Sequence, residues 1–341
     1  MKAVVWQAPG QIELLEVPDA RIEQAGDAVV RLTMSAICGT DLHMVRGTMP
    51  DMVPGTVLGH EGVGVVEAVG RDVRGFQPGD RVVIPSTICC GTCAYCRAGY
   101  TAQCDNANPN GPAAGTSFFR WAKIHRPGPV NGLQATFARV PFAAANLIPL
   151  PDAVTDEQAI VLSDIYPTAW FGAQCAEVSR GDTVAVFGSA IVELTGGIGA
   201  DRVIDAVGVD AYSGTGEQHE SEIAEVTGGA GSTWEHGTAP SQAAQWTVEA
   251  VAKAGSIGII GVYPPTMRSW PIGAAMNKNL TVKMGNCPHR AIIPQLVDLV
   301  ASGVSDPARL ITHIEPVDDV LKADRTFDAH EPGWVKVALT V

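Results

Sequence analysis

Charged residues are scarce in this chain of 341 residues, and basic residues are scarcer than acidic ones. Lys and Arg number 23 against 36 Asp and Glu, which gives a net charge of −13. A nucleic-acid-binding surface needs clustered Lys and Arg to release the counterions of phosphates, so this balance argues against nucleic acid as a partner. The charged fraction of 17%, beside 46% hydrophobic residues, excludes a disordered chain and describes a packed globular protein.

Long hydrophobic runs are also missing. No apolar run approaches the ~20 residues of a membrane-spanning helix. Met1–Trp6 reads as the start of a strand, and no basic, apolar and small-residue series follows it as in a signal peptide. We therefore expect no membrane partner and a cytoplasmic protein. In that reducing compartment, closely spaced thiols among the eight cysteines are more often metal ligands than disulfides.

The length predicts two domains, and the texture of the chain changes between them. Up to about residue 150 short apolar or alternating runs are separated by Gly and Pro, which is typical of β-structure. Beyond residue 152, apolar runs ending in Gly or Met predict buried parallel strands: Thr183–Gly188, Arg202–Gly208, Ser256–Gly261 and Leu280–Met284. Helical spacing alternates with them, at Thr155–Ala176, Gln242–Lys253 and Ile292–Ser302. Residues 209–240 read as a surface excursion, and the alternation predicts a doubly wound α/β domain.

Four thiols lie within fifteen residues, at Cys90, Cys93, Cys96 and Cys104. The two-residue gaps form tight turns that direct neighbouring sulfurs toward one centre. Four thiolates without histidine predict a closed structural zinc site that stiffens a lobe and does no chemistry. The alternative is a set of free buried thiols or a redox pair. Cys89 is the spare thiol, because only one of two adjacent side chains can face the metal.

A second set of metal-binding residues is formed by Cys38, His60 and Glu61. Three mixed ligands leave one coordination position open for a reactant, which is typical of catalytic zinc. If either Cys38 or His60 stood alone, a buried thiol or a hydrogen-bonded core histidine would explain it equally well. The remaining histidines have no ligand spacing and are interpreted as surface or packing residues: His125, His219, His236, His289, His313 and His330.

Five segments in order along the chain resemble the zinc-dependent medium-chain alcohol dehydrogenases, in the branch similar to formaldehyde and polyol dehydrogenases. They are Cys38–His43, Gly59–Gly64, the four-cysteine lobe, Leu162–Trp170 and Gly333–Val337. The resemblance implies a GroES-like β-rich catalytic domain, a Rossmann-like cofactor domain and a catalytic zinc in the cleft between them. It also implies two zinc ions per chain, NAD or NADP as cofactor, and a homodimer or homotetramer.

The resemblance implies that Asp164 is the third protein ligand of the catalytic zinc, beside Cys38 and His60, and that Glu61 is the acid next to the metal. An alcohol in the open position would be acidified by Zn²⁺. Thr40 would then accept the alcohol proton, and His43 would complete a relay to solvent. Asp41 is expected to accept the spare ring N–H of His60 and fix its tautomer, with a helix or turn cap as the alternative.

The cofactor region departs from the family pattern. Gly188 follows the strand Thr183–Phe187 as a first glycine, but Ser189–Leu194 supplies no second or third glycine. The sequence therefore predicts that about 50 residues are missing after Ala190, which would leave the first strand as an exposed edge. A segment not included in this sequence, an engineered deletion and a naturally shortened homologue all remain open. The remaining predicted cofactor contacts are Thr168, Gly188, Val262 and Tyr263.

These interpretations predict a GroES-like domain at residues 1–151 and 290–341, with its zinc lobe at 89–105, and a truncated Rossmann-like domain at 152–289. The leading hypothesis is an oxidoreductase that transfers hydride between a small alcohol or aldehyde and NAD(P). The alternative is a zinc protein that binds no dinucleotide and is either silent or a Lewis-acid hydrolase. Neither the substrate nor the choice between NAD and NADP follows from the sequence. Aromatic and apolar residues for a substrate pocket, which core packing explains equally well, are Phe118, Phe119, Trp121, Trp170 and Met284.

Overall fold

The computed structural model describes residues 1–47, 52–108, 115–119, 130–186, 195–227 and 237–341. The chain divides into two compact units. Unit 1 comprises Met1–Val45, Asp51–Pro167 and Pro288–Val341, and unit 2 comprises Arg46–Pro50 and Thr168–Cys287. The first boundary between the main segments falls after Pro167, whereas the sequence predicts it after residue 151.

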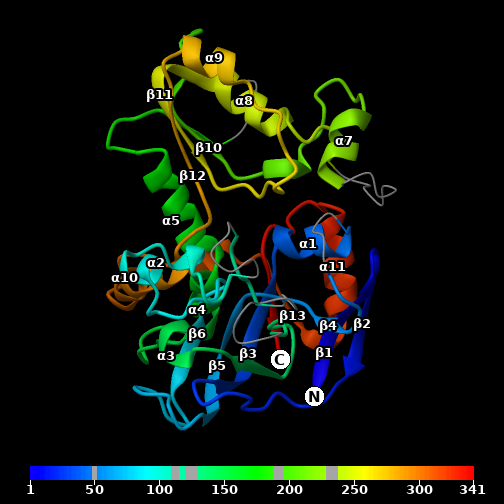
Figure 1. Cartoon of the computed structure of the whole chain (residues 1–341), viewed down its shortest axis with the longest axis vertical. Coiled ribbons are helices and arrows are strands. Elements are labelled where there is room, and N and C mark those ends of the chain that lie inside the picture. Colours follow the sequence, from blue (N-terminus) through cyan, green and yellow to red (C-terminus); the bar gives the residue numbers. More distant parts are fainter. Residues whose placement is uncertain (48–51, 109–114, 120–129, 187–194, 228–236) are drawn as a thin grey trace. The chain divides into compact units, whose positions relative to one another are not determined.

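Unit 1 is built on two antiparallel-rich sheets (Figure 1). The three-stranded sheet has the order β2-β1-β4, and the seven-stranded sheet has the order β13-β14-β3-β5-β6-β8, with β7 also paired to β3. The strands are β1 (Lys2–Ala8), β2 (Gln11–Glu16), β3 (Ala28–Ile37), β4 (Thr56–Val57), β5 (Gly62–Val69), β6 (Arg81–Ile84), β7 (Phe137–Val140), β8 (Ile148–Pro149), β13 (His313–Pro316) and β14 (Val337–Thr340).

The core of unit 1 lies along the central strands of the larger sheet. Eight of the ten residues of β3 are buried, Thr33 is partly buried, and only Arg31 is exposed. Leu32, Val66, Ile84 and Phe119 belong to one cluster of buried side chains. Removing this apolar surface from water is the main favourable term in forming the sheet.

Short helices surround these sheets. They are α1 (Gly39–Val45), α2 (Ala94–Arg97), α3 (Ala143–Asn146), α4 (Asp156–Ser163), α10 (His289–Ala301) and α11 (Val320–Asp328), with 3-10 turns η1 (Thr101–Gln103), η3 (Pro307–Leu310) and η4 (Val317–Asp319). Thr155 caps α4 through a capping box with Gln158, each side chain bonding the other residue's backbone N–H. The next helix, α5 (Ile165–Cys175), crosses the boundary of the two units.

Unit 2 contains a parallel sheet of four strands in the order β12-β11-β10-β9. The strands are β9 (Val184–Val186), β10 (Ala200–Asp205), β11 (Val251–Ile259) and β12 (Thr281–Met284). The remaining elements are η2 (Gly208–Asp210), α7 (Glu220–Thr227), α8 (Gln242–Ala250) and α9 (Ile272–Asn277). β9 pairs directly with β10, and its Val184 and Val186 are exposed. α8 packs along β10 and β11 (Figure 1).

Three predicted segments differ from the structure. The segment Thr155–Ala176 is two helices, because the chain leaves helical geometry at Asp164. The helix predicted at Gln242–Lys253 ends at Ala250, where the chain enters β11 and pairs Val251 with Ala200. The surface excursion predicted at 209–240 contains the short helix α7, which the sequence did not predict.

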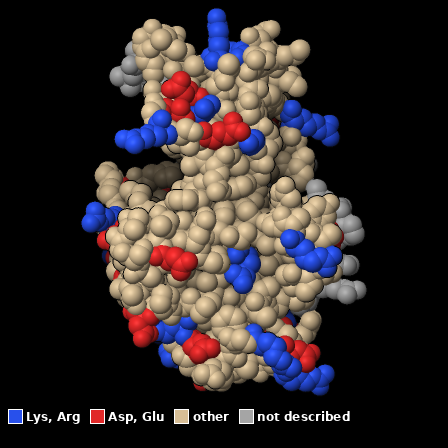
Figure 2. Space-filling view, turned by 90° about the vertical axis from the view of Figure 1, so that its left-hand side faces the viewer, with Lys and Arg blue, Asp and Glu red and all other residues tan. Residues whose placement is uncertain are grey.

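The surface drawn in Figure 2 carries scattered basic and acidic side chains on a largely uncharged background. Blue and red groups are interspersed on this face, as expected for a chain with few charged residues. In the part of the chain that the structure describes, no helix is long and apolar enough to cross a membrane.

Candidate metal centres and cofactor edge

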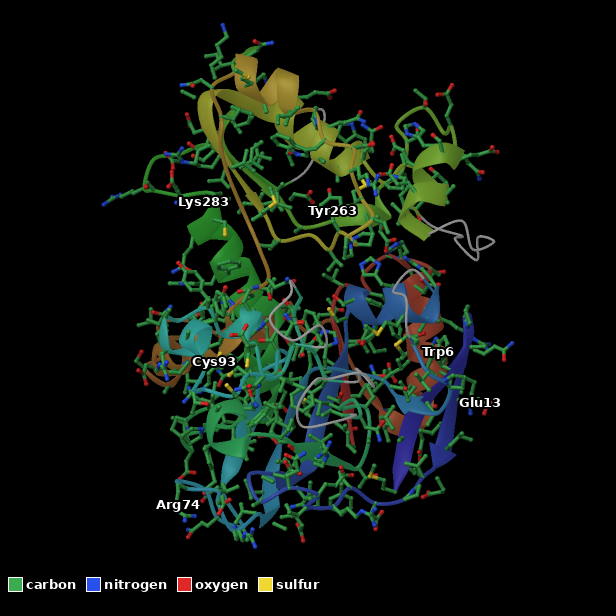
Figure 3. The ribbon with its side chains drawn as sticks, viewed as in Figure 1. Trp6, Glu13, Arg74, Cys93, Tyr263 and Lys283 are labelled. Atoms are coloured by element: carbon green, nitrogen blue, oxygen red, sulfur yellow. The ribbon has the colours of Figure 1, made fainter. Side chains whose placement is uncertain are left out.

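The four-cysteine lobe brings the predicted sulfur atoms together. Sγ of Cys90 lies 4.0 Å from Sγ of Cys96, and Sγ of Cys93 lies 4.0 Å from Sγ of Cys104. A tetrahedron with Zn–S bonds of ~2.3 Å has sulfur–sulfur edges of about 3.8 Å. All four sulfurs lie within 4.8 Å of one another, so the residues fit a closed Zn²⁺ site. Cys93 is labelled in Figure 3, among the sulfur atoms of this lobe.

N–H groups surround these sulfurs in the way that thiolates require. The backbone N–H of Cys93 donates to Sγ of Cys90 at 3.3 Å, and Nδ2 of Asn106 donates to the same sulfur at 3.2 Å. Burial alone would raise the pKa of Cys90, but hydrogen bonds from Thr92, Asn106 and Cys93 lower that pKa to about 6. Cys90 is therefore prepared to carry negative charge before a metal arrives, whereas neighbouring thiols and burial raise the pKa of Cys96 and Cys104.

Strand register gathers the second set of ligands at one end of the larger sheet. Ser35 of β3 is paired with Gly62 of β5, and Gly62 is paired with Ile84 of β6. Cys38 follows the end of β3 and His60 precedes the start of β5. Because these two strands are antiparallel, both residues lie at the same end of the sheet. An antiparallel sheet thus joins residues that are distant in sequence.

Asp164 reaches this end of the sheet from α4. Ser163, the last residue of α4, accepts the backbone N–H of Gly62 at 3.1 Å through its hydroxyl oxygen. Its carbonyl accepts the backbone N–H of Ser86 at 3.1 Å. These bonds fix the end of α4 against β5 and β6, and the next residue, Asp164, turns out of the helix into the site.

The ligand atoms of this second site converge. Oδ2 of Asp164 lies 2.9 Å from Nε2 of His60 and 3.8 Å from Sγ of Cys38. With a carboxylate oxygen of Glu61, these atoms all lie within 4.8 Å of one another. Thiolate, imidazole and carboxylate form a donor set that zinc prefers, so the residues present fit a catalytic zinc.

Hydrogen bonds orient the ligands. Nδ1 of His60 lies 3.2 Å from Oδ1 of Asp41, and Oδ2 of Asp41 accepts the backbone N–H of Cys38 at 3.0 Å. Asp41 therefore fills both of its predicted roles: one carboxylate oxygen contacts the ring of His60, and the other caps the turn at the backbone N–H of Cys38. With its Nδ1–H donated to Asp41, His60 turns Nε2 toward Asp164 and Cys38. Burial would raise the pKa of Asp164, but its contacts with the imidazoles of His289 and His60 hold that pKa well below its usual value.

Glu61 is held by a lysine that the sequence analysis did not assign to the site. Nζ of Lys336 lies 2.6 Å and 2.7 Å from the two carboxylate oxygens of Glu61, and it also donates to the carbonyl of Ile37 at 3.1 Å. Lys336 directly precedes β14, where Val337 is paired with Ile37. Burial opposes its charge, but the attraction of Glu61 raises the pKa of Lys336 above its usual value. The motif that contains Lys336 was noted in the sequence, but only the strand register brings its side chain to Glu61.

His289 is a correction to the sequence analysis, which interpreted it as a surface or packing residue. It is 2% exposed, and its Nε2 lies 2.7 Å from Oδ1 of Asp164. Its Nδ1 lies 3.1 Å from Oγ1 of Thr87. His289 and Asp164 are 125 positions apart in the sequence, so no local spacing could have revealed this contact.

The proposed relay residues lie on α1. Oγ1 of Thr40 is 3.8 Å from Sγ of Cys38, and His43 is one turn further along the helix and buried. Phe118, a predicted pocket residue, meets the ring of His60 edge-on at 6.2 Å between centroids. Phe119 is fully buried in the core of unit 1, and Trp121 lies outside the described residues.

The predicted cofactor residues belong to unit 2. Val262 follows β11, and its carbonyl accepts the backbone N–H of Val209 at 2.9 Å. Tyr263, labelled in Figure 3, donates its hydroxyl to Asp205 at 2.7 Å. The loops after β10 and β11 therefore meet at the carboxyl edge of the parallel sheet, where dinucleotides bind. Thr168 lies in α5.

Gly188 lies outside the described residues, together with the segment 187–194, where a pyrophosphate-binding loop would be expected. Within the described residues, the predicted cofactor contacts therefore lie after β11 and in α5.

Comparisons with known proteins define the class. A family model described as the alcohol dehydrogenase GroES-like domain matches residues 24–152. The zinc-type alcohol dehydrogenase-like protein AdhB of Bacillus subtilis is 31% identical over 392 aligned residues, which cover 99% of this chain and 100% of AdhB. An alcohol dehydrogenase of Cupriavidus necator is 31% identical over 364 residues, covering 99% of this chain and 98% of that protein. The structure of the alcohol dehydrogenase TADH from Thermus sp. ATN1 covers 100% of both chains with 27% identity and a TM-score of 0.78.

The two sets of ligands and the alcohol dehydrogenase relatives define a zinc-dependent oxidoreductase. The chain belongs to the zinc-dependent medium-chain alcohol dehydrogenases. The predictions of the family, of a GroES-like domain with a Rossmann-like parallel sheet, and of an alcohol dehydrogenase as opposed to a zinc protein without dinucleotide are confirmed.

Proposed function

We propose that Cys38, His60 and Asp164 hold the catalytic zinc of an enzyme that transfers hydride between a small alcohol or aldehyde and NAD or NADP. The observation that carries this proposal is the convergence of the sulfur, nitrogen and oxygen atoms of these three buried or half-buried residues. A bound Zn²⁺ at this position would supply Lewis acidity to the substrate oxygen.

The protein's own residues would move the proton. Thr40 lies beside Cys38, within the first turn of α1, so its hydroxyl is suited to accept the proton of the alcohol. His43 follows three residues later on the same helix, a spacing that puts the two side chains on one face. We propose that His43 takes the proton from Thr40 and delivers it to solvent.

Glu61 would keep its carboxylate beside the metal ligands while remaining paired with Lys336. Its two oxygens contact Lys336, so the pair adds no uncompensated charge to the buried site. Phe118 would close one side of the substrate position, because its ring packs against His60. An apolar wall at that place favours a small alcohol or aldehyde over a charged substrate.

Hydride would pass to a nicotinamide held by Thr168, Gly188, Val262 and Tyr263. The hydrogen bond from the backbone N–H of Val209 to the carbonyl of Val262 joins the loops after β10 and β11. This supports a nicotinamide site at that edge of the parallel sheet. We also propose that the Rossmann-like unit lacks about 50 residues after Ala190. Two observations support this: β9 pairs directly with β10, and the alignment with AdhB spans 392 positions although the chain has 341 residues.

The four-cysteine lobe would hold a second, structural zinc and take no part in the chemistry. We further propose that the enzyme is cytoplasmic, because its closely spaced thiols need a reducing compartment. A homodimer or homotetramer is proposed from the resemblance to the family.

Two matched variants test this assignment. Asp164→Asn removes the charge of a catalytic ligand, whereas Asp152→Asn removes a charge on the exposed segment before α4. Zinc content and the formation of reduced nicotinamide from a panel of alcohols are measured for both. We expect Asp164→Asn to lose one zinc ion per chain and all activity, and Asp152→Asn to keep both. Full activity in Asp164→Asn would refute the assignment.

A further inference from the structure

We propose that His289 is a positioning residue of the catalytic metal site: its Nε2–H holds one oxygen of Asp164, so that the other oxygen faces Cys38 and His60. This inference rests on the proposed function, because it takes Asp164 as a ligand of the catalytic metal. It adds to the site a residue for which the motifs along the sequence gave no indication.

The two oxygens of Asp164 have separate partners. Oδ1 lies 2.7 Å from Nε2 of His289 and accepts the hydroxyl of Ser86 at 3.2 Å. Oδ2 lies 2.9 Å from Nε2 of His60 and 3.8 Å from Sγ of Cys38. One oxygen is therefore engaged by the protein, while the other is directed at the remaining ligands. A carboxylate held in this way offers a single oxygen to a metal in a fixed direction.

Thr87 contacts the ring nitrogen of His289 that does not face Asp164. Its Oγ1 lies 3.1 Å from Nδ1 of His289, and a threonine hydroxyl can donate to that nitrogen. If Nδ1 accepts, the neutral ring carries its proton on Nε2, which is the nitrogen that faces Asp164. Thr87, His289 and Asp164 thus form a series of hydrogen bonds that ends at Oδ1 of Asp164. Oδ2 is the oxygen that faces the metal position.

Burial makes the geometry of these hydrogen bonds rigid. Thr87 is 1% exposed and His289 2% exposed, so water cannot readily replace either partner. Burying an imidazole is costly unless both of its nitrogens are hydrogen-bonded, and an aliphatic side chain would fill the same volume without that requirement. His289 is the first residue of α10, so helical geometry sets its backbone as well.

Loss of the bond to Oδ1 should weaken the metal site. Without it the carboxylate of Asp164 can rotate, and the direction of Oδ2 is no longer set by the protein. Removing an outer hydrogen-bond partner of a metal ligand lowers metal affinity about 10- to 100-fold. A metal in the four-cysteine lobe would be held by its own four thiols, so the affinity of that lobe should not change.

The experiment compares three replacements of His289. His289→Gln can place an amide N–H near the former Nε2, His289→Asn holds its amide too close to the backbone, and His289→Leu keeps bulk without a donor. The zinc-free proteins are titrated with Co²⁺, and the visible ligand-field spectrum and a competing chelator report affinity. The four-cysteine lobe, loaded first, serves as the internal control.

We expect the Leu and Asn variants to bind Co²⁺ at the second site about 10- to 100-fold more weakly, with an altered spectrum, and the Gln variant to approach the unmodified protein. Equal affinity and identical spectra in all three would overturn the role of His289. Where the Leu variant does not fold, the comparison of Asn with Gln decides: equal binding by these two overturns it.

A second pair of variants separates this inference from the proposed function. Cys38→Ser and Asp164→Asn each remove a ligand and should abolish or strongly weaken binding at the second site. If both of these variants bind Co²⁺ like the unmodified protein, the proposed metal site itself is wrong. If they lose the ion while His289→Leu keeps it unchanged, only the role of His289 fails.

Discussion

Replacing Lys336 by methionine should strongly destabilise unit 1. Nζ of Lys336 lies 2.6 Å and 2.7 Å from the oxygens of Glu61, and the two side chains are 3% and 0% exposed. Methionine keeps most of the volume of lysine but removes the ammonium, which leaves a buried carboxylate without its counter-charge. Breaking a buried pair by removing one partner costs about 3–5 kcal/mol.

The double variant Glu61→Gln with Lys336→Met provides the control. It removes both charges, so the penalty of an unpaired buried carboxylate disappears and much of the stability should return. A domain of this size loses about 2–4 °C in melting temperature per kcal/mol, so Lys336→Met should melt roughly 6–20 °C lower than the unmodified protein.

Calorimetry of the zinc-loaded proteins measures these shifts. The comparison is made with saturating zinc, because loss of metal would lower the melting temperature by itself. A fall of less than about 2 °C for Lys336→Met would refute the reasoning, since it would mean that Glu61 is neutral or solvated without the lysine. A double variant that melts as low as the single one would also contradict it.

Further outcomes follow from the four-cysteine lobe and from a glycine with a positive φ angle. Cys93→Ser should leave one zinc ion per chain by elemental analysis and lower the melting temperature; two retained ions would contradict the closed site. In the chelated protein, Cys90 should ionise near pH 6, so its thiolate absorbance should rise there and be absent in Cys90→Ser. Because this folded pKa lies below the ordinary thiol pKa of 9.0, the ionisation stabilises the chelated lobe progressively from about pH 6 up to pH 9, and the gain is lost as pH falls through 6. Gly59→Ala should cost about 1–3 kcal/mol or more in denaturant unfolding, because Gly59 has φ +86° and a Cβ would lie 2.5 Å from Cγ of Gln134. Gly10→Ala, with φ +73° and open space, should lose less, and equal losses would remove the steric argument.

The sequence predicted those parts of the site that lie in compact motifs. The four thiols occur within fifteen residues, and their spacing alone indicated a closed metal site. Thr155 begins the predicted helical segment Thr155–Ala176, and the structure shows that it caps α4 through a capping box. These features depend on neighbours along the chain, so local spacing carries the information.

Lys336 and His289 could not be found in this way. Lys336 meets Glu61 because Val337 is paired with Ile37, a register that no local pattern specifies. His289 meets Asp164 because α10 begins near the end of α4, far away in sequence. A lone histidine or lysine has many possible partners, and only the packed structure selects one.

The end of α4 shows a second limit of sequence patterns. The apolar spacing of Thr155–Ala176 is helical throughout, yet the chain breaks at Asp164. Helical periodicity reports which face is buried, and it does not register a change of helix axis. The break is what turns the carboxylate of Asp164 into the site.

The most direct test of the whole account is hydride transfer by the zinc-loaded protein. The purified chain, shown by elemental analysis to hold two zinc ions, is mixed with NAD⁺ or NADP⁺ and a panel of small primary and secondary alcohols. The near-ultraviolet absorbance of reduced nicotinamide is followed, with Asp164→Asn as the reference. The account predicts reduction of one of the two cofactors by the unmodified protein and none by the variant. A protein with both zinc ions that reduces neither cofactor with any alcohol, and binds neither, would contradict it.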